Sequence, residues 1–298
     1  MQVIAIYGPT ASGKTEVAEA LADRIGSAEL VSADSAQVYW GLPILTNQSQ
    51  RPARLVGIWP LSHEASVGEY QALAHRAIDE LIAAGKVPIV VGGTGLYLRA
   101  ALAELDLPPA PSPGARERWQ AFYDVHGAER THAELAERDP GVAAAVHPND
   151  RRRVVRALEL AEAGASLRPA SDELWSRRTR HPTLLVGLDL PPDELERRFE
   201  RRAAAMLERG VEEEVRRALA QPLSSTARKI MGLREVAELP PDEARAAIVL
   251  RNRQYAAYQR KWMRRIPGLV PVDADRPASA VAAELAGLRG ESGRAGRH

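Results

Sequence analysis

Residues 8–15 read Gly8-Pro9-Thr10-Ala11-Ser12-Gly13-Lys14-Thr15 and match the pattern G-x-x-x-x-G-K-[ST] at every fixed position. The apolar run from Gln2 to Tyr7 precedes this stretch, and a helical pattern starts near Lys14. A strand, a glycine-rich turn and a helix in this order let backbone N–H groups surround a phosphate at a helix N-terminus. Lys14 adds a point charge there, and the Thr15 hydroxyl can reach a metal ion. The stretch predicts a P-loop that starts a parallel α/β sheet.

Other short apolar runs predict further strands of the same sheet. Glu29 to Ser32, Val87 to Val91 and Thr183 to Leu190 are such runs, and helical patterns such as Gly68 to Ala84 lie between them. Strands that alternate with helices are typical of a parallel sheet covered on both faces. The sequence therefore predicts an α/β protein with a doubly wound parallel sheet.

A proline-rich segment, Leu107 to Gly114, interrupts this alternation, since proline cannot continue a helix. From Ala115 to about Arg180 the chain shows helical patterns rich in Arg and Ala and no strand pattern, and it then returns to the sheet. We therefore predict an all-helical insertion at residues 115–181 within a P-loop core formed by residues 1–114 and, with C-terminal helices, by residues 182–298.

The bulk composition excludes some classes of protein. Lys+Arg 40 against Asp+Glu 39 gives a formal charge of +1, so the total charge neither requires nor rules out a nucleic-acid partner. The chain has no cysteine, which excludes disulfides and thiolate zinc sites. It has no apolar run long enough for a membrane span or a signal peptide, so we expect a cytoplasmic protein with no membrane partner.

A P-loop alone does not name a reaction. NTPases and kinases usually place a metal-holding Asp after a neighbouring apolar strand, but here Val87 to Val91 is followed by Gly92-Gly93-Thr94. The acid best placed to face the P-loop is Asp34, just after the strand Glu29 to Ser32. Asp34 could cap a helix, or its carboxylate could act as a general base.

Five motifs in a fixed order decide between these possibilities. They are GPTASGKT at residues 8–15, SADSAQVY at 32–39, GGTGLY at 92–97, HPNDRRRVVRALE at 147–159 and IMGLRE at 230–235. Together they closely resemble the tRNA dimethylallyltransferase family, also called tRNA isopentenyltransferases, from about Val3 to about Arg264. The family's activity, prenyl transfer to tRNA, is the expectation that follows for this chain.

The resemblance implies a role for each matched residue. The P-loop would hold the pyrophosphate of dimethylallyl diphosphate instead of a nucleotide, which agrees with the missing acid after Val91. N6 of the adenosine immediately 3′ of the anticodon would attack the allylic carbon, and Asp34 would take the amine proton. Thr94 would lie near the reacting amine and the pyrophosphate. The residues expected at the target nucleotide are Asp34, Ser35, Ala36, Gln37 and Thr94.

Cations are expected at the departing pyrophosphate, since stabilising its charge should be the largest catalytic contribution. Besides Lys14, the resemblance assigns Arg198 to this task, in the pattern L-x-x-R-F-x-x-R at residues 195–202. Its neighbours Arg197 and Arg201 are expected to face solvent. Mg²⁺ is the expected cofactor, with Thr15 as a protein ligand.

RNA contacts are expected mainly in the insertion. Arg152, Arg153 and Arg156 are spaced to share one side of a helix that follows a cap at Asn149 or Asp150. A run of arginines is usually a solvated face, but the resemblance favours contacts with tRNA phosphates here. It also places Arg116 near the target base.

The last long helical pattern carries one stripe of large side chains, most of which we expect in the core: Ile248, Tyr255, Tyr258 and Trp262. Its arginines, Arg251 and Arg260 among them, could flank the anticodon loop, where unpaired bases are recognised by stacking. Two segments depart from the family's pattern. Residues 46–49 read TNQS where the family usually has TAKP, and residues 255–259 read YAAYQ where it usually has YAKRQ.

Three other functions remain open. A P-loop kinase of a small metabolite would share the fold, and an adenylate isopentenyltransferase would use free AMP as the acceptor. An RNA-binding protein with an inactive P-loop is the third alternative, against which Lys14, Thr15 and Asp34 argue. The basic insertion favours a macromolecular acceptor, namely the anticodon stem-loop of tRNA, and we expect a monomer.

Overall fold

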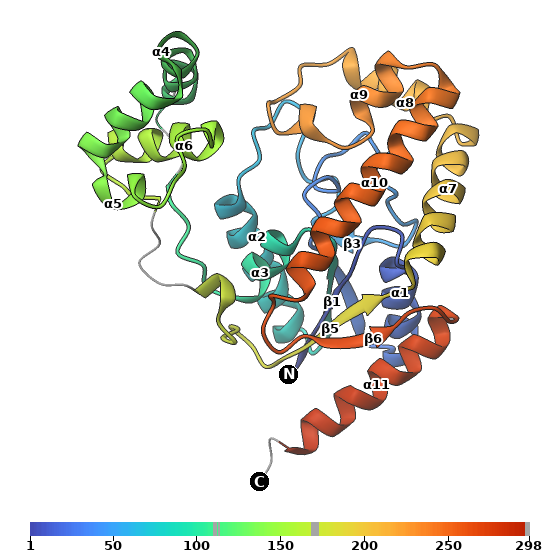
Figure 1. Cartoon of the computed structure of the whole chain (residues 1–298). Coiled ribbons are helices and arrows are strands. Elements are labelled where there is room, and N and C mark those ends of the chain that lie inside the picture. Colours follow the sequence, from blue (N-terminus) through green and yellow to red (C-terminus); the bar gives the residue numbers. More distant parts are fainter. Residues whose placement is uncertain (110–111, 113, 168–172, 296–298) are drawn as a thin grey trace. The chain divides into compact units, whose positions relative to one another are not determined.

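The structure of the protein is a computed structural model that describes residues 1–109, 112, 114–167 and 173–295. The chain divides into two compact units (Figure 1). The first comprises Met1–Glu104 and Leu174–His298, and the second comprises Leu105–Glu173. Three residues of the predicted proline-rich linker, Ala110, Pro111 and Pro113, lie outside the described residues.

Within the described residues of the first unit, six parallel strands form one sheet in the order β3-β2-β4-β1-β5-β6. The P-loop strand, β1, lies between β4 and β5, so the direction of winding reverses beside it. Ligands of such sheets bind outside the carboxyl ends of the strands, at this reversal. The strands are β1 Val3–Tyr7, β2 Ala28–Ser32, β3 Ala53–Arg54, β4 Val87–Gly92, β5 Thr183–Asp189 and β6 Val270–Asp273.

The central strands are apolar along their length because helices cover both faces of the sheet. Every residue of β1 is buried, with no more than 1% of its surface exposed. One layer contains α1 and α11, which pack against each other, and the other contains α2 and α3 (Figure 1). The helices of this unit are α1 Lys14–Ile25, α2 Val67–Ala83, α3 Gly95–Leu102, α7 Pro192–Glu208, α8 Val211–Leu219, α9 Leu233–Glu238, α10 Pro241–Met263 and α11 Ala278–Ala295.

The predicted doubly wound parallel sheet is confirmed. Two strands that the sequence did not reveal, β3 and β6, close its edges. β3 has only two residues, and β6 contains Pro271 and exposes three of its four residues. Neither strand carries the buried apolar run or the regular alternation by which strands are recognised.

The second unit contains helices and no strand among its described residues. α6 begins after Asp150, whose carboxylate accepts the Arg153 N–H as an N-cap at 3.1 Å. A small apolar core that includes Trp119, Leu135 and Leu158 holds the unit together. Its helices are α4 Ala115–Arg138, which is kinked at Gly127, α5 Pro140–Ala143 and α6 Arg151–Glu162.

The predicted insertion spans residues 115–181, but its last part, residues 174–181, belongs to the first unit. Arg180 binds both carboxylate oxygens of Asp79 on α2, at 3.2 and 3.0 Å. Arg99 of α3, only 1% exposed, donates to the carbonyls of Leu174 and Ser176 at 2.9 and 3.0 Å. These contacts fix the path by which the chain returns to the sheet. No helix in the described ranges combines the length and apolar character that a bilayer crossing needs.

Candidate active site

The turn between β1 and α1 is held in a compact shape by its own contacts. The Ser12 N–H and the Lys14 Nζ both donate to the Pro9 carbonyl, at 3.2 and 2.7 Å. Ala11 and Gly13 have positive φ angles of 61° and 84°, a conformation that turns successive N–H groups toward one side. The turn lies at the carboxyl end of β1, where the strand order predicts a ligand.

Two cationic side chains meet at this turn, Lys14 at the start of α1 and Arg202 from α7. Burial lowers the pKa of Lys14 to about 8, and the nearby Asp34 carboxylate opposes that shift. Burial also lowers the pKa of Arg202, whose Nη1 donates to Thr10 Oγ1 at 2.9 Å. The Arg202 Nε and the Ser12 Oγ are buried and have no hydrogen-bond partner among the described residues. Buried donors beside two cations are what an anion would satisfy.

The predicted Arg198 also lies at the P-loop. It precedes Arg202 by one turn of α7, and its Nη1 lies 3.5 Å from the position that a Cβ on Gly13 would take. Its Nε donates to Glu194 at 2.8 Å, and Arg197 and Arg201 bind the same carboxylate from exposed positions. The hydrogen bonds from Arg198 and then Arg197 lower the pKa of Glu194 to about 2. Sequence reasoning selected Arg198 and missed Arg202, although both occupy the Arg positions of one L-x-x-R-F-x-x-R pattern.

Across the P-loop, the loop after β2 meets the loop after β4. The Ser35 N–H donates to Thr94 Oγ1 at 3.2 Å, and the Ser35 hydroxyl lies at the same distance from that oxygen. The Asp34 carboxylate accepts the Ala36 N–H at 2.9 Å. This hydrogen bond orients the carboxylate, and its donor is an uncharged backbone group. The structure thus brings the predicted residues Asp34, Ser35 and Thr94 together beside the P-loop.

The predicted nucleotide contact Gln37 has internal partners. Its Oε1 accepts the Ser32 hydroxyl at 3.0 Å, and its Nε2 donates to the carbonyls of Thr46 and Asn47 at 3.1 and 3.3 Å. Gln37 therefore connects β2 to the loop at residues 46–47, the segment where the sequence departs from the family pattern. Its role toward a nucleotide stays a prediction.

Gln259 of α10 joins the P-loop to the loop after β4. Its Oε1 accepts the Thr10 N–H at 2.7 Å, and its Nε2 donates to the Gly93 carbonyl at 2.8 Å. The side chain is 1% exposed. The contact is possible because position 93 is glycine, since a Cβ there would lie 2.3 Å from the Gln259 Nε2.

Tyr255 lies one helical turn before Gln259 and faces the same loop. Its hydroxyl donates to the Gly93 carbonyl at 3.4 Å and lies 3.4 Å from Thr94 Oγ1. Burial raises the pKa of Tyr255 above its ordinary value, so the hydroxyl keeps its proton at neutral pH. The sequence predicted Tyr255 only as part of a stripe that is mostly core and did not single out Gln259, because nothing local in the sequence indicates either long-range contact.

The two neighbours of β1 supply no free carboxylate for a metal. β4 ends in glycines, and Asp189 at the end of β5 accepts both Nε and Nη2 of Arg260, at 3.0 and 2.7 Å. No three His, Cys, Asp or Glu side chains of the described residues cluster as a metal site. The hydroxyl that the sequence assigns to a cation belongs to Thr15, which is half-buried at the start of α1.

In the second unit, the predicted RNA-binding arginines fall into two groups. Arg116 and Arg156 bind opposite oxygens of the buried Glu159, each at 2.9 Å, and Arg156 also donates to the Pro109 carbonyl. Arg152 and Arg153 are exposed. Arg156 and Arg116 therefore contribute to the fold of the unit, and Arg152 and Arg153 carry the solvent-facing charge.

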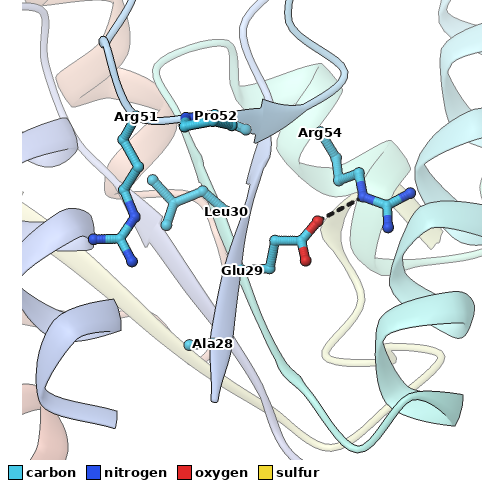
Figure 2. A pocket seen from close by; sticks show the side chains of 7 residues that line it. Ala28, Glu29, Leu30, Arg51, Pro52 and Arg54 are labelled. Carbon is cyan, nitrogen blue, oxygen red and sulfur yellow. Dashed lines mark hydrogen bonds and ion pairs between the residues drawn. The ribbon is translucent and has the colours of Figure 1, made fainter. Parts of the chain in front are cut away.

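An open pocket of about 470 Å³ lies elsewhere on the first unit (Figure 2). Residues of β2 and of the segment 51–54 line it, and they begin with Ala28 and Glu29 at the amino end of β2. Arg54 binds Glu29 at 2.7 Å, and hydrogen bonds from Arg54 and then Lys86 lower the pKa of Glu29. Because its charges are paired and it begins at the opposite end of the strand from Asp34, this pocket is not the site.

The protein is a P-loop protein of the α/β class. Its P-loop is rich in cations and suits an anionic ligand, and Asp34 and Thr94 across from it suit a second, polar reactant. The chain belongs to the IPP transferase family. The family model described as IPP transferase matches residues 37–266, and one described as isopentenyl transferase matches residues 1–54. The protein is therefore a prenyltransferase.

Relatives with curated names support this membership. The chain is 40% identical to a tRNA dimethylallyltransferase of Streptomyces coelicolor over 279 residues, which are 89% of this chain and 88% of the relative. It is 38% identical to a protein of the same name from Thermobifida fusca, with 91% and 90% of the two chains covered.

Solved structures show the same fold. A tRNA isopentenylpyrophosphate transferase of Bacillus halodurans aligns with a TM-score of 0.70 and 29% identity over 100% of this chain and 99% of that one. A eukaryotic dimethylallyltransferase acting on tRNA aligns with a TM-score of 0.74 over 96% of this chain and 78% of that one. At 24% identity the second likeness bears on the fold alone.

The bridge made by Gln259 can be tested directly. Gln259→Leu leaves the buried Thr10 N–H without its partner and the Gly93 carbonyl with only the longer bond from Tyr255, so we expect unfolding to become easier by roughly 1–3 kcal/mol and pyrophosphate binding to weaken. Denaturant unfolding and calorimetric titration measure the two effects. Gln254→Leu, at an exposed position of the same helix, is the control and should change neither. Normal pyrophosphate affinity in the Gln259 variant would show that the bridge does not shape the P-loop.

Proposed function

We propose that the protein transfers the dimethylallyl group from dimethylallyl diphosphate to N6 of the adenosine immediately 3′ of the anticodon in tRNA, with release of pyrophosphate. The observation that carries the proposal is the pairing of an anion site at the P-loop with Asp34 and Thr94 across it. Membership of the IPP transferase family supports it. An RNA substrate agrees with the expected cytoplasmic location, and the expected monomer stays a prediction.

The donor's diphosphate would lie in the turn Gly8–Thr15, against the backbone N–H groups at the start of α1. Lys14 and Arg202 would contact its oxygens, because both are half-buried cations at the turn and the buried Arg202 Nε is an unused donor. Arg198, beside Gly13, would add a third positive charge. As the allylic C–O bond breaks, negative charge grows on the leaving pyrophosphate, and these fixed cations stabilise it.

The residues at the P-loop fit Mg²⁺ as the cofactor. Mg²⁺ is usually held by one or two protein oxygens together with substrate phosphates, and it does not require a cluster of carboxylates. Thr15 would be the protein ligand, as in other P-loops, and the donor's diphosphate oxygens would complete the site. When bound, the ion neutralises charge on the leaving group.

Asp34 is the residue we assign as the general base. N6 forms a bond to the allylic carbon while the C–O bond to pyrophosphate breaks, and the amine proton passes to the Asp34 carboxylate. The hydrogen bond from the Ala36 N–H orients this carboxylate. The next residue, Ser35, donates its N–H to Thr94, which brings the threonine close to Asp34. Asp34, Ser35, Ala36, Gln37 and Thr94 would together contact the target nucleotide.

The alternatives fit the structure less well. A P-loop kinase would need an acid at the end of a neighbouring strand, but Arg260 occupies Asp189. An adenylate isopentenyltransferase would share the donor site, and the isopentenyl transferase family model does match residues 1–54. The IPP transferase model matches residues 37–266, and the relatives named tRNA dimethylallyltransferase align over about nine-tenths of the chain, which favours a tRNA acceptor.

The acceptor is decided by incubating the protein with labelled dimethylallyl diphosphate, Mg²⁺ and either total tRNA or AMP. Label should appear in tRNA, at N6 of the nucleoside released by digestion. Label in AMP alone would replace tRNA by a free nucleotide as the substrate. Transfer of phosphate from ATP to a small metabolite, with no prenyl transfer, would make the protein a kinase.

The role of Asp34 is tested by Asp34→Asn, which keeps an oxygen for the Ala36 N–H and removes the base. Turnover should fall by roughly 10²- to 10⁴-fold, while the affinity for the donor stays near that of the parent protein. Single-turnover rates and donor titration measure the two quantities. If the single-turnover rate is unchanged, another group takes the proton.

The pKa of Lys14 predicts how donor binding depends on pH. With a pKa of about 8 in the free protein, the Lys14 ammonium loses its proton above pH 8, and the diphosphate loses a cation. The donor Kd should therefore rise by up to tenfold per pH unit above pH 8, with proton uptake on binding. Lys14→Arg keeps its charge throughout this range, so its Kd should stay flat. Parallel slopes in the two proteins would assign the pH effect to another group.

The exposed arginines of α6 predict a salt effect. If Arg152 and Arg153 contact RNA phosphates, replacing both by Gln should flatten the slope of log affinity against log salt by roughly 0.7 to 0.9 per lost contact. Arg156 is excluded from this variant because its loss would uncover the buried Glu159. The same change at the exposed Arg216 and Arg217 of α8 is the charge-matched control. Equal slopes in all three proteins would move phosphate recognition away from α6.

A further inference from the structure

α10 presents an aromatic ring to solvent beyond the site. The sequence predicted most of the stripe formed by Ile248, Tyr255, Tyr258 and Trp262 as core, but only Ile248 is buried, at 3% exposed, whereas Tyr258 is 53% exposed. The rings of Tyr255 and Tyr258 are nearly parallel, with an interplanar angle of 21° and centroids 6.3 Å apart. Tyr255 contacts Thr94 of the site, and Tyr258 is its exposed neighbour, so the two rings connect the site with the surface.

The exposed ring stands next to a fixed aromatic stack. Tyr258 meets Trp262 edge to face with centroids 6.3 Å apart, and Trp262 packs on Trp175 at 4.8 Å. Trp262 itself rests on α3, where a Cβ at Gly95 would lie 2.3 Å from its ring. The stack therefore has a rigid base within the first unit.

The far end of the stack is also anchored. Trp175 is held by Arg99, which donates to the carbonyls on both sides of it, at Leu174 and Ser176. The Arg265 guanidinium covers the Trp175 ring at 3.9 Å from its centroid. With Trp175 covered by Arg265 and Trp262, Tyr258 is the ring of this stack with the most open surface.

The charge around Tyr258 favours a polyanion. Lys261, Arg264 and Arg265 are exposed at the end of α10. An aromatic ring beside a row of cations is how proteins hold single-stranded nucleic acid, with the ring stacked on a base and the cations along the backbone. The same surface is too polar to serve as an apolar protein interface, whose centre is depleted of charge.

We propose that the Tyr258 ring stacks on an unpaired nucleobase of the RNA substrate next to the target nucleotide, and that Lys261 and Arg264 contact the neighbouring phosphates. This inference rests on the proposed function, because the target amine would lie near Thr94, which contacts Tyr255, the neighbour of Tyr258. The stack of Trp262 and Trp175 keeps the ring in place before RNA binds, which reduces the entropy lost on binding.

The test compares Tyr258→Leu with Tyr258→Phe on an anticodon stem-loop RNA. Loss of one stacked base should raise the KM for RNA by roughly 5- to 100-fold in the Leu variant, with kcat and the KM for the donor unchanged. The Phe variant keeps the ring and should behave as the parent protein. Leu250→Ala, at a side chain 49% exposed on the same helix, controls for loss of apolar surface.

A second readout reports stacking itself. 2-Aminopurine placed at each loop position beside the target should be quenched on binding at one position, and this quench should disappear in the Leu variant only. An unchanged RNA KM in Tyr258→Leu overturns the inference. An equal loss in Tyr258→Phe overturns it as well, since the hydroxyl would then be the contact. If the parent protein prenylates no tRNA, the proposed function fails, while the quench still shows whether Tyr258 stacks on RNA.

Discussion

The buried carboxamide of Gln259 is the contact on which the geometry of the site depends. It holds the Thr10 N–H of the P-loop and the Gly93 carbonyl of the loop after β4 at once. These two loops carry the two halves of the proposed reaction, the diphosphate end at Lys14 and the acceptor end at Thr94. The glycine at position 93 leaves room for this carboxamide, since a Cβ there would lie 2.3 Å from the Gln259 Nε2. A shift of α10 would therefore change the spacing between donor and acceptor directly.

The sequence predicts the local parts of this arrangement well. The P-loop and the sheet follow from patterns within a few residues, and Asp34 follows from its place after a buried strand. The remaining contacts join residues far apart in the chain. Arg202 meets Thr10 across 192 positions and Gln259 meets it across 249. No periodicity encodes such pairs. The helical pattern of α7 is compatible with either Arg198 or Arg202 at the P-loop, and only the packing of α7 shows that both lie there.

The arginines show why counting cations could not locate the RNA surface. Arg116 and Arg156, which the sequence predicts as RNA ligands, both neutralise the buried Glu159, which would otherwise be an unpaired charge in the small core of the second unit. Their contacts with RNA stay a prediction. Arg260 pairs in the same way with Asp189, whose side chain is partly exposed. Cations free to meet phosphate are those that the fold leaves at exposed positions, such as Arg152 and Lys261. Spacing along a helix reveals which residues share a side and says nothing of which acid lies opposite.

Lys14 and Arg202 at the P-loop, unlike the arginines paired with Glu159, are partly shielded from water and hydrogen-bond to no carboxylate of the described residues. Taking Lys14 and Arg202 out of water without a full set of partners lowers the pKa of both, which is unfavourable for the free protein. The same low-dielectric surroundings strengthen their attraction to a diphosphate, and most of all to the charge that grows on it as the C–O bond breaks. Neutralising these cations with internal carboxylates, as Glu159 does for Arg116, would stabilise the free protein and remove that gain. In the proposed reaction, the unpartnered Arg202 Nε is a donor available to the leaving pyrophosphate.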